Sequence, residues 1–258
     1  IWATLQSLLR TDPAQLSQGR DVRQPGVYDR LELACAWRLE HQKLWDRYVS
    51  GQRQIQEQVA RLRRNGVVSS ALALKTDHAR VPGGLNVEAN ERVLLHGTKP
   101  DALFSILSNG PNEHFSGGLF GHGTYFAEDV GKNDQYVTAD SAHDASGGRK
   151  ELHTRLFAKV RHPGKLYYLL VCRVSLGHSV RTQDGRTSMD GGASVFAASD
   201  SRELAAVPRA SPPVHFHSLV AETGGRIARF REFIVFHGSY IYPEYLLAFQ
   251  RMGSNGAV

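Results

Sequence analysis

The longest apolar run of the chain, residues 166–176, places the strongest limit on its fold. Within the run only Arg173 and Ser175 are polar. It is too short for a membrane-spanning helix, which needs about 18 consecutive apolar residues, and no other part of the sequence reaches that length. Its length and its content of Leu, Val and Tyr are typical of a buried strand. We therefore expect a soluble globular protein with no membrane partner.

The composition agrees with a protein that folds without disulfides or metals. Of the 258 residues, 41% are hydrophobic and 22% are charged, which excludes disordered and fibrous chains. The two cysteines, Cys35 and Cys172, are too few for a disulfide scaffold and lack the paired spacing of metal ligands. We expect an intracellular protein, nuclear or cytoplasmic.

Positive charge is concentrated near the N-terminus. The net charge is +6, and residues 1–66 hold 11 basic and 7 acidic side chains, against 20 and 18 in the rest. This excess permits a nucleic-acid partner. Aromatic residues are not interleaved with the charges as base-stacking would require, so an ordinary solvated helix is favoured.

The hydrophobic pattern predicts helices early in the chain and strands late. Helices are predicted at 2–9, 44–62 and 99–109, the last with Thr98 as its N-cap. Strands are predicted at 27–37, 166–176, 218–221, 229–236 and 245–250. Residues 139–165 and 178–213 are predicted to be loops or insertions, and the second is long enough to be a functional lid. This order of elements indicates the α+β class.

Three segments, 94–98, 117–127 and 231–236, carry polar residues that do not fit a buried core. His96 ends an apolar strand before Gly97, whose backbone can approach a ligand closely. Taken alone, His96 fits a structural histidine better, and the glycines at 117–123 fit a tight turn. Glu232 borders four apolar residues, so its carboxylate needs either a catalytic task or a partner such as a nearby arginine.

A series of motifs, taken in order, resembles the catalytic domain of the poly(ADP-ribose) polymerase (PARP) family, the diphtheria-toxin-like ADP-ribosyltransferases, and most of all its tankyrase type. The motifs lie at 28–33, 44–48, 96–98, 120–127, 132–136, 172–177, 231–236 and 242–247. The resemblance implies an α+β fold with two packed, mostly antiparallel β-sheets flanked by helices. It also implies a catalytic domain over residues 27–258, preceded by a helical or irregular extension over residues 1–26.

The resemblance implies an enzyme that cleaves the nicotinamide–ribose bond of NAD and transfers ADP-ribose to a protein acceptor. NAD is then a co-substrate, and no metal is expected. A glutamate at position 232 permits elongation to poly(ADP-ribose) but does not establish it. Two alternatives remain open: an NAD glycohydrolase, in which water is the acceptor, and a catalytically idle module that binds nucleic acid.

The resemblance also implies a role for individual residues. His96, Tyr125 and Glu232 form the catalytic set, with His96 on a ribose hydroxyl and Glu232 stabilising the positive charge that develops on the sugar. Tyr125 and Tyr136 enclose the nicotinamide ring. The residues expected to bind the co-substrate are Gly97, Thr98, Asn112, His114, Phe115, Phe126, Ala127, Lys132, Asn133 and Tyr136.

The sequence departs from the family pattern at two places that bear on the site. Asn133 stands where many members have a serine that grips the carboxamide, and we expect Asn133 to contact the ligand there in its place. Tankyrases hold zinc in the segment that matches 139–165, but this chain has no cysteine there. It offers His143, His153 and His162, which we expect to be scattered on the surface without a metal.

Overall fold

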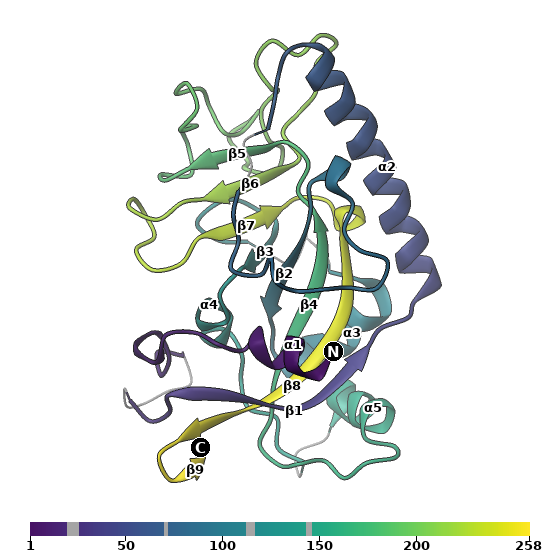
Figure 1. Cartoon of the computed structure of the whole chain (residues 1–258), viewed down its shortest axis with the longest axis vertical. Coiled ribbons are helices and arrows are strands. Elements are labelled where there is room, and N and C mark those ends of the chain that lie inside the picture. Colours follow the sequence, from purple (N-terminus) through teal and green to yellow (C-terminus); the bar gives the residue numbers. More distant parts are fainter. Residues whose placement is uncertain (20–25, 70–71, 112–116, 143–145) are drawn as a thin grey trace.

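The computed structural model describes the chain apart from residues 20–25, 70–71, 112–116 and 143–145. A nine-stranded sheet runs through it, with helices on both faces (Figure 1). The helices are α1 (Trp2–Ser7), α2 (Gln42–Arg64), α3 (Pro100–Asn109), α4 (Val130–Asp134) and α5 (Gly147–Leu156), with 3-10 turns η1 (Pro13–Gln15), η2 (Val87–Ala89) and η4 (Gly238–Tyr240). The strands are β1 (Arg30–Arg38), β2 (Glu91–Gly97), β3 (Thr124–Ala127), β4 (Tyr167–Ser175), β5 (Ser179–Thr182), β6 (Ser218–Ala221), β7 (Glu232–Val235), β8 (Ile241–Gly253) and β9 (Gly256–Ala257).

The sheet has the order β1-β8-β4-β2-β3-β7-β6-β5, with β9 paired to β8. Its neighbours are antiparallel except for β5 and β6, so the α+β class and the mostly antiparallel pairing are confirmed. The two expected sheets are two parts of this one sheet. They meet where β2 pairs with β3 through Leu95 and Ala127 alone. The strands that carry His96, Tyr125 and Glu232 are therefore neighbours at this junction.

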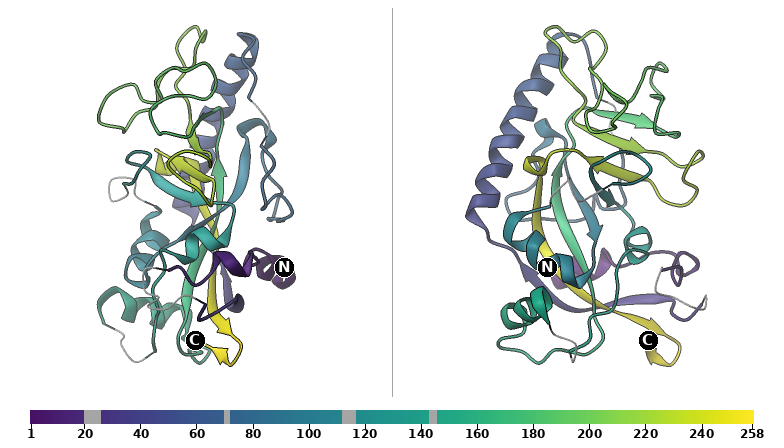
Figure 2. Two further views of the ribbon diagram at one scale, coloured as in Figure 1. Left: turned by 90° about the vertical axis from the view of Figure 1, so that its left-hand side faces the viewer. Right: turned by 180° about the vertical axis from the view of Figure 1, so that it is seen from behind.

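Strand β4 is buried along its whole length because both faces of the sheet are covered. One face packs against Leu5 of α1 and the leucines at 8 and 9 that follow it. The other face packs against apolar residues of α2, α3 and α5, and Figure 2 shows the helices on the two faces. Alternate residues of β4 enter the two clusters: Tyr168, Leu170, Cys172 and Val174 in one, and Tyr167, Leu169 and Val171 in the other. This double cover explains why the run is apolar throughout instead of alternating.

The three predicted helices are present as α1, α2 and α3, whereas α5 was not predicted. Helix α2 buries its predicted apolar stripe. Helix α3 begins at Pro100 with Lys99 as its N-cap and no side-chain cap, so the predicted Thr98 cap is wrong. Helix α5 lies inside the predicted loop 139–165, where of its side chains only Leu152 is buried. None of the described helices is both long enough and apolar enough to cross a membrane.

Residues 183–213, within the predicted 178–213 insertion, fold over the glycine-rich segment 117–123. The backbone N–H of His122 donates to the carbonyl of Ser201 at 3.0 Å. A Cβ on Gly121 would lie 2.8 Å from the ring of Phe196, so a glycine is needed for this close contact. The insertion therefore supports the segment that leads into β3.

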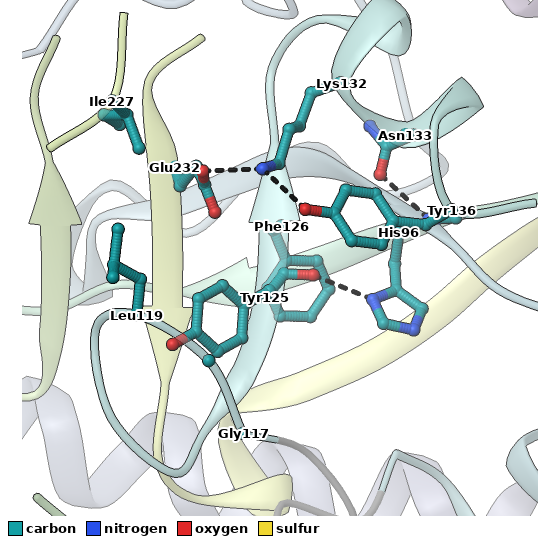
Figure 3. Close-up of a pocket in the computed structure, with 12 residues that line it drawn as sticks. His96, Gly117, Leu119, Tyr125, Phe126, Lys132, Asn133, Tyr136, Ile227 and Glu232 are labelled. Atoms are coloured by element: carbon teal, nitrogen blue, oxygen red, sulfur yellow. Dashed lines mark hydrogen bonds and ion pairs between the residues drawn. The ribbon is translucent and has the colours of Figure 1, made fainter. Parts of the chain in front are cut away.

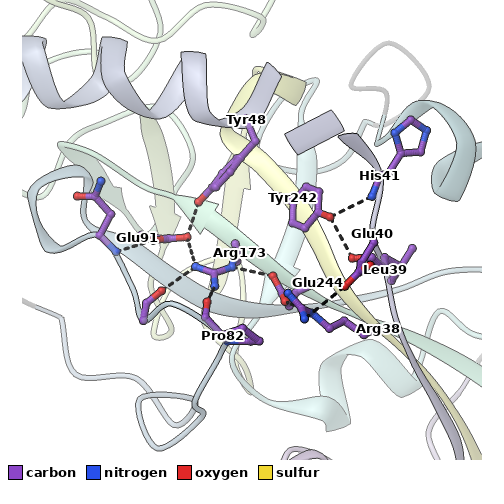
Figure 4. Close-up of polar contacts among 12 residues, drawn as sticks. Arg38, Leu39, Glu40, His41, Tyr48, Pro82, Glu91, Arg173, Tyr242 and Glu244 are labelled. Atoms are coloured by element: carbon purple, nitrogen blue, oxygen red, sulfur yellow. Dashed lines mark hydrogen bonds and ion pairs between the residues drawn. The ribbon is translucent and has the colours of Figure 1, made fainter. Parts of the chain in front are cut away.

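A buried arginine joins β2, β4 and β8 on the other side of the junction (Figure 4). The guanidinium of Arg173 donates from Nε to Glu244 at 2.8 Å and from a terminal nitrogen to Glu91 at 3.0 Å. It also donates to the carbonyl groups of Gly84 and Pro82. Because Tyr48 of α2 donates to Glu91 at 2.7 Å, the helix is tied into the same network. The network fixes β2 at the end opposite to His96.

Candidate active site

A cavity of about 520 Å³ opens where β2, β3, β7 and α4 meet (Figure 3). This volume falls in the usual range for small-molecule sites. The described residues around it are His96, Gly97, Gly117, Gly118, Leu119, Tyr125, Phe126, Lys132, Asn133, Tyr136, Ile227 and Glu232. Eight of these were predicted from the sequence, including the whole catalytic set.

The structure does not bring every predicted residue to the cavity. Ala127 is fully buried between β2 and β7, where it pairs with Leu95 and Glu232. Thr98 is partly buried between β2 and α3, and neither it nor Ala127 lines the cavity. The predicted residues Asn112, His114 and Phe115 lie outside the described residues.

Two apolar residues of the cavity wall, Leu119 and Ile227, were missed by the sequence analysis. Leu119 is 47% exposed in the glycine-rich segment before β3, and Ile227 lies in the connection between β6 and β7. A large apolar side chain among glycines and charged residues, as in 117–119 and 224–229, is the signal that could have pointed to them.

His96 is held in one tautomer by the next strand. Its Nδ1 lies 2.8 Å from the carbonyl oxygen of Tyr125, which can only accept, so Nδ1 carries the proton and Nε2 is an acceptor. Burial lowers the pKa of His96 below its ordinary value, although the bond to Tyr125 opposes this effect. The imidazole is thus neutral near pH 7 and able to accept a hydrogen bond from a ligand hydroxyl.

The hydroxyl of Tyr125 is hydrogen-bonded to the backbone of the glycine-rich segment that precedes it. The hydroxyl donates to the carbonyl of Gly121 and accepts from the backbone N–H of Phe120, both at 2.9 Å. A Cβ on Gly118 would lie 2.9 Å from this phenol, so the segment wraps closely around the ring. Burial raises the pKa of Tyr125 well above its ordinary value, so the phenol stays protonated. The ring remains as the part of Tyr125 that a ligand can contact.

Lys132 joins two further polar side chains of the cavity, those of Glu232 and Tyr136. Its ammonium donates to Oε1 of Glu232 at 2.7 Å and to the hydroxyl of Tyr136 at 3.1 Å (Figure 3). The ammonium also lies 4.8 Å from the centre of the Tyr136 ring. The alternative to a catalytic task for Glu232 was an ion pair with a nearby arginine, but Arg231 pairs with Glu128. The carboxylate of Glu232 is 6% exposed and faces the cavity beside two tyrosines.

Asn133 contacts the backbone of Gly97 directly. Its Oδ1 accepts from the N–H of Gly97 at 2.8 Å, and its Nδ2 donates to the carbonyl of Asp129 at 3.2 Å. A Cβ on Gly97 would lie 2.5 Å from the carbonyl oxygen of Asn133. The close packing of α4 on β2 therefore requires a glycine at position 97. From the sequence, this glycine was expected to allow the close approach of a ligand.

Helix α4 has only five residues and is fixed from both ends. Asp129 caps its N-terminus by accepting from the N–H of Gly131 at 2.8 Å and from the hydroxyl of Thr11 at 2.7 Å. At its last residue, Asp134 accepts from Nε of buried Arg251 at 2.9 Å. A helix this short has little stability of its own, so these contacts hold Lys132 and Asn133 in place.

The segment that matches the tankyrase zinc site brings two histidines together. Nε2 of His153 lies 2.7 Å from Oδ2 of buried Asp140, and Nε2 of His162 lies 3.6 Å from the same oxygen. The expectation that these two histidines are scattered is wrong, and His143 lies outside the described residues. Nδ1 of His162 accepts from the N–H of Gly164 at 3.1 Å, so the neutral ring carries its proton on Nε2.

That protonation state does not fit a metal ligand. A histidine that ligates through Nε2 presents a bare nitrogen there and donates from Nδ1. Tyr168 also donates to Oδ2 of Asp140, at 2.7 Å. Oδ2 of Asp140 thus accepts from both His153 and Tyr168, and we derive no metal chemistry from these residues.

Comparison with known proteins shows which family the chain that forms this cavity belongs to. The family described as poly(ADP-ribose) polymerase catalytic domain matches residues 18–251. The chain is also 34% identical over 100 residues to the poly [ADP-ribose] polymerase tankyrase of Caenorhabditis elegans. That match covers 37% of this chain and 3% of the relative, so the chain spans a small part of the relative's length. The chain belongs to the PARP catalytic domain family and is an ADP-ribosyltransferase enzyme that uses NAD.

Proposed function

We propose that this chain cleaves the nicotinamide–ribose bond of NAD and transfers ADP-ribose to a protein, with His96, Tyr125 and Glu232 as its catalytic set. The observation that carries the proposal is the position of Glu232. Its buried carboxylate faces one cavity together with a neutral histidine and two tyrosines. This combination suits a planar cation attached to a sugar.

Glu232 acts on the sugar in this proposal. When the bond between the ribose carbon and the ring nitrogen breaks, the electron pair stays on the nitrogen and positive charge develops on the ribose. A fixed carboxylate in a partly dry site stabilises that charge. The oxygen of the incoming acceptor group then bonds to the ribose carbon, and the Glu232 carboxylate accepts the proton that this oxygen loses.

The neighbouring side chains bind and orient the co-substrate. Nε2 of His96 accepts from a ribose hydroxyl, consistent with its tautomer. The rings of Tyr125 and Tyr136 pack against the nicotinamide ring, whose positive charge is attracted to aromatic faces. Phe126 packs beside His96 with ring centres 5.5 Å apart and so supports its orientation. Lys132 holds Glu232.

Further parts of the proposal concern the chain as a whole. We propose a catalytic domain over residues 27–258 in an intracellular protein, with residues 1–26 as an extension that supports α4 through Thr11. We propose no nucleic-acid partner for the basic N-terminal region. Arg30, Arg38 and Arg63 pair with carboxylates of this chain, which favours the reading of a solvated surface.

The test is a gel of products formed from labelled NAD with the full chain and candidate acceptor proteins. The proposal predicts label bound to protein. A ladder of products would indicate elongation, whereas a single sharp band would indicate transfer of one ADP-ribose. Release of free ADP-ribose without bound label would instead identify a glycohydrolase, and no consumption of NAD would refute the catalytic proposal.

A further inference from the structure

Asn133 uses both ends of its side-chain amide within the protein. Its two partners fix the orientation of the amide, because the N–H of Gly97 can only donate and the carbonyl of Asp129 can only accept. The residue is 5% exposed, yet it lines the cavity together with Gly97. The Gly97 N–H is therefore a donor at the cavity wall that the protein already uses.

The side chain of asparagine is itself a carboxamide. A nicotinamide group offers the same carbonyl oxygen and the same NH2 group as Asn133. A single N–H forms one strong hydrogen bond, and leaving a buried donor or acceptor without a partner is costly. A ligand carbonyl that takes the Gly97 N–H must therefore displace Oδ1 of Asn133.

We infer that Asn133 is a specificity-determining residue that competes with carboxamide-bearing ligands for the N–H of Gly97. The inference rests on the proposed function, which identifies nicotinamide as the ligand group. It reverses the role suggested by the sequence, in which Asn133 contacts the ligand carboxamide. The two roles predict opposite effects of truncation, since removing a competitor strengthens binding and removing a contact weakens it.

The experiment measures benzamide binding to the full chain by calorimetry. Benzamide is a suitable probe because it carries the carboxamide on a neutral aromatic ring. With Asn133→Ala the Gly97 N–H loses its internal acceptor, and benzamide is expected to bind about tenfold more tightly, which corresponds to one hydrogen bond. Asn133→Ser, whose side chain is shorter, is expected to tighten binding in the same direction.

Gln135→Ala is the matched control. Gln135 also bears a carboxamide, and its Nε2 donates to the carbonyl of Gly131 in α4 at 3.1 Å. It does not line the cavity. Its truncation is expected to leave benzamide affinity unchanged, so a loss of helix stability can be separated from the release of Gly97.

A second measurement uses the unmodified chain and does not depend on the folding of a variant. In its NMR spectrum, benzamide is expected to shift the backbone amide of Gly97 and the side-chain NH2 of Asn133 together, because the Gly97 N–H changes its acceptor and the displaced Asn133 amide moves. Static Asn133 resonances in the bound state would overturn the inference.

The outcomes separate this inference from the proposed function. Benzamide that binds the unmodified chain but binds Asn133→Ala equally or more weakly overturns the competition and leaves the enzyme assignment intact. If neither the unmodified chain nor either variant binds benzamide or releases nicotinamide from NAD, the proposed function fails and the inference fails with it.

Discussion

The ammonium of Lys132 lies 2.7 Å from the Glu232 carboxylate, although 100 positions separate the two residues. Lys132 reaches it from α4, whereas Glu232 begins β7. Both side chains are largely buried, with 18% and 6% exposed. An ion pair in such a place holds the carboxylate at a defined position in the cavity.

We expect Lys132→Met to lower both stability and turnover. The substitution leaves the Glu232 carboxylate buried without its partner, which should cost roughly 1–3 kcal/mol of unfolding free energy. Loss of its fixed position should reduce nicotinamide release from NAD roughly tenfold. Urea denaturation and a turnover assay measure the two effects. Lys132→Arg keeps the charge and is the control; equal losses in both variants would argue against a role for the pairing itself.

The second prediction concerns the network around Arg173. Arg173→Met leaves Glu91 and Glu244 as buried carboxylates without their shared cation (Figure 4). Breaking a buried pair in this way typically costs about 3–5 kcal/mol. The loss should appear in urea denaturation, and adding Glu244→Gln to the variant should recover part of it. Full stability of the single variant would show that the network is not a structural brace.

Gly51→Ala is predicted to change stability in the direction opposite to the one that helix propensity alone would give. Gly51 lies in the middle of α2, where glycine to alanine normally stabilises by about 1 kcal/mol. A Cβ there would lie 2.4 Å from the backbone oxygen of Ser239 in η4. We expect Gly51→Ala to destabilise by roughly 1–3 kcal/mol through overpacking. Ser50→Ala, on the exposed side of α2, is the control and should not destabilise. A stabilised Gly51→Ala variant would contradict the close contact.

The lowered pKa of buried His217 leads to a prediction of how the stability of the fold depends on pH. Burial lowers the pKa of His217 to about 4, with His178 and His237 adding to the lowering. The folded protein thus keeps this ring neutral, while the unfolded chain takes up a proton below its ordinary value of 6.5. Stability should therefore fall as the pH drops from 6.5 towards 4, by up to about 3 kcal/mol from this residue.

Denaturation of His217→Gln over the same pH range checks the assignment. Nε2 of His217 lies 2.8 Å from the side-chain oxygen of Gln58, and its Nδ1 accepts from the N–H of His178. The variant is expected to be less stable at pH 7 because these bonds change, but its loss of stability between pH 6.5 and 4 should be smaller. An unchanged pH dependence would assign the effect to another group.

The main elements could be predicted because burial determines their residue pattern. β6 lies at the predicted residues 218–221, and α2 extends the predicted pattern by two residues at each end. α5 could not be predicted in this way, since its sequence is mostly polar and buries Leu152 alone of its described side chains. α4 is too short for any periodicity and depends on contacts from Thr11 and Arg251.

The residues that line the site could be predicted better than the contacts among them. Motif resemblance brought His96, Tyr125 and Glu232 together, and the structure places all three around one cavity. Which groups pair inside the cavity depends on how β2, β7 and α4 pack. For that reason the partners of Glu232 and Gly97, which are Lys132 and Asn133, could not be derived from the sequence.

The rate of nicotinamide release from NAD by Glu232→Gln tests the central claim most directly. Glutamine keeps the size of the side chain but removes the charge that stabilises the developing positive ribose. The account predicts a loss of at least about 100-fold in rate, with benzamide affinity retained. A rate within about threefold of the unmodified chain would contradict it.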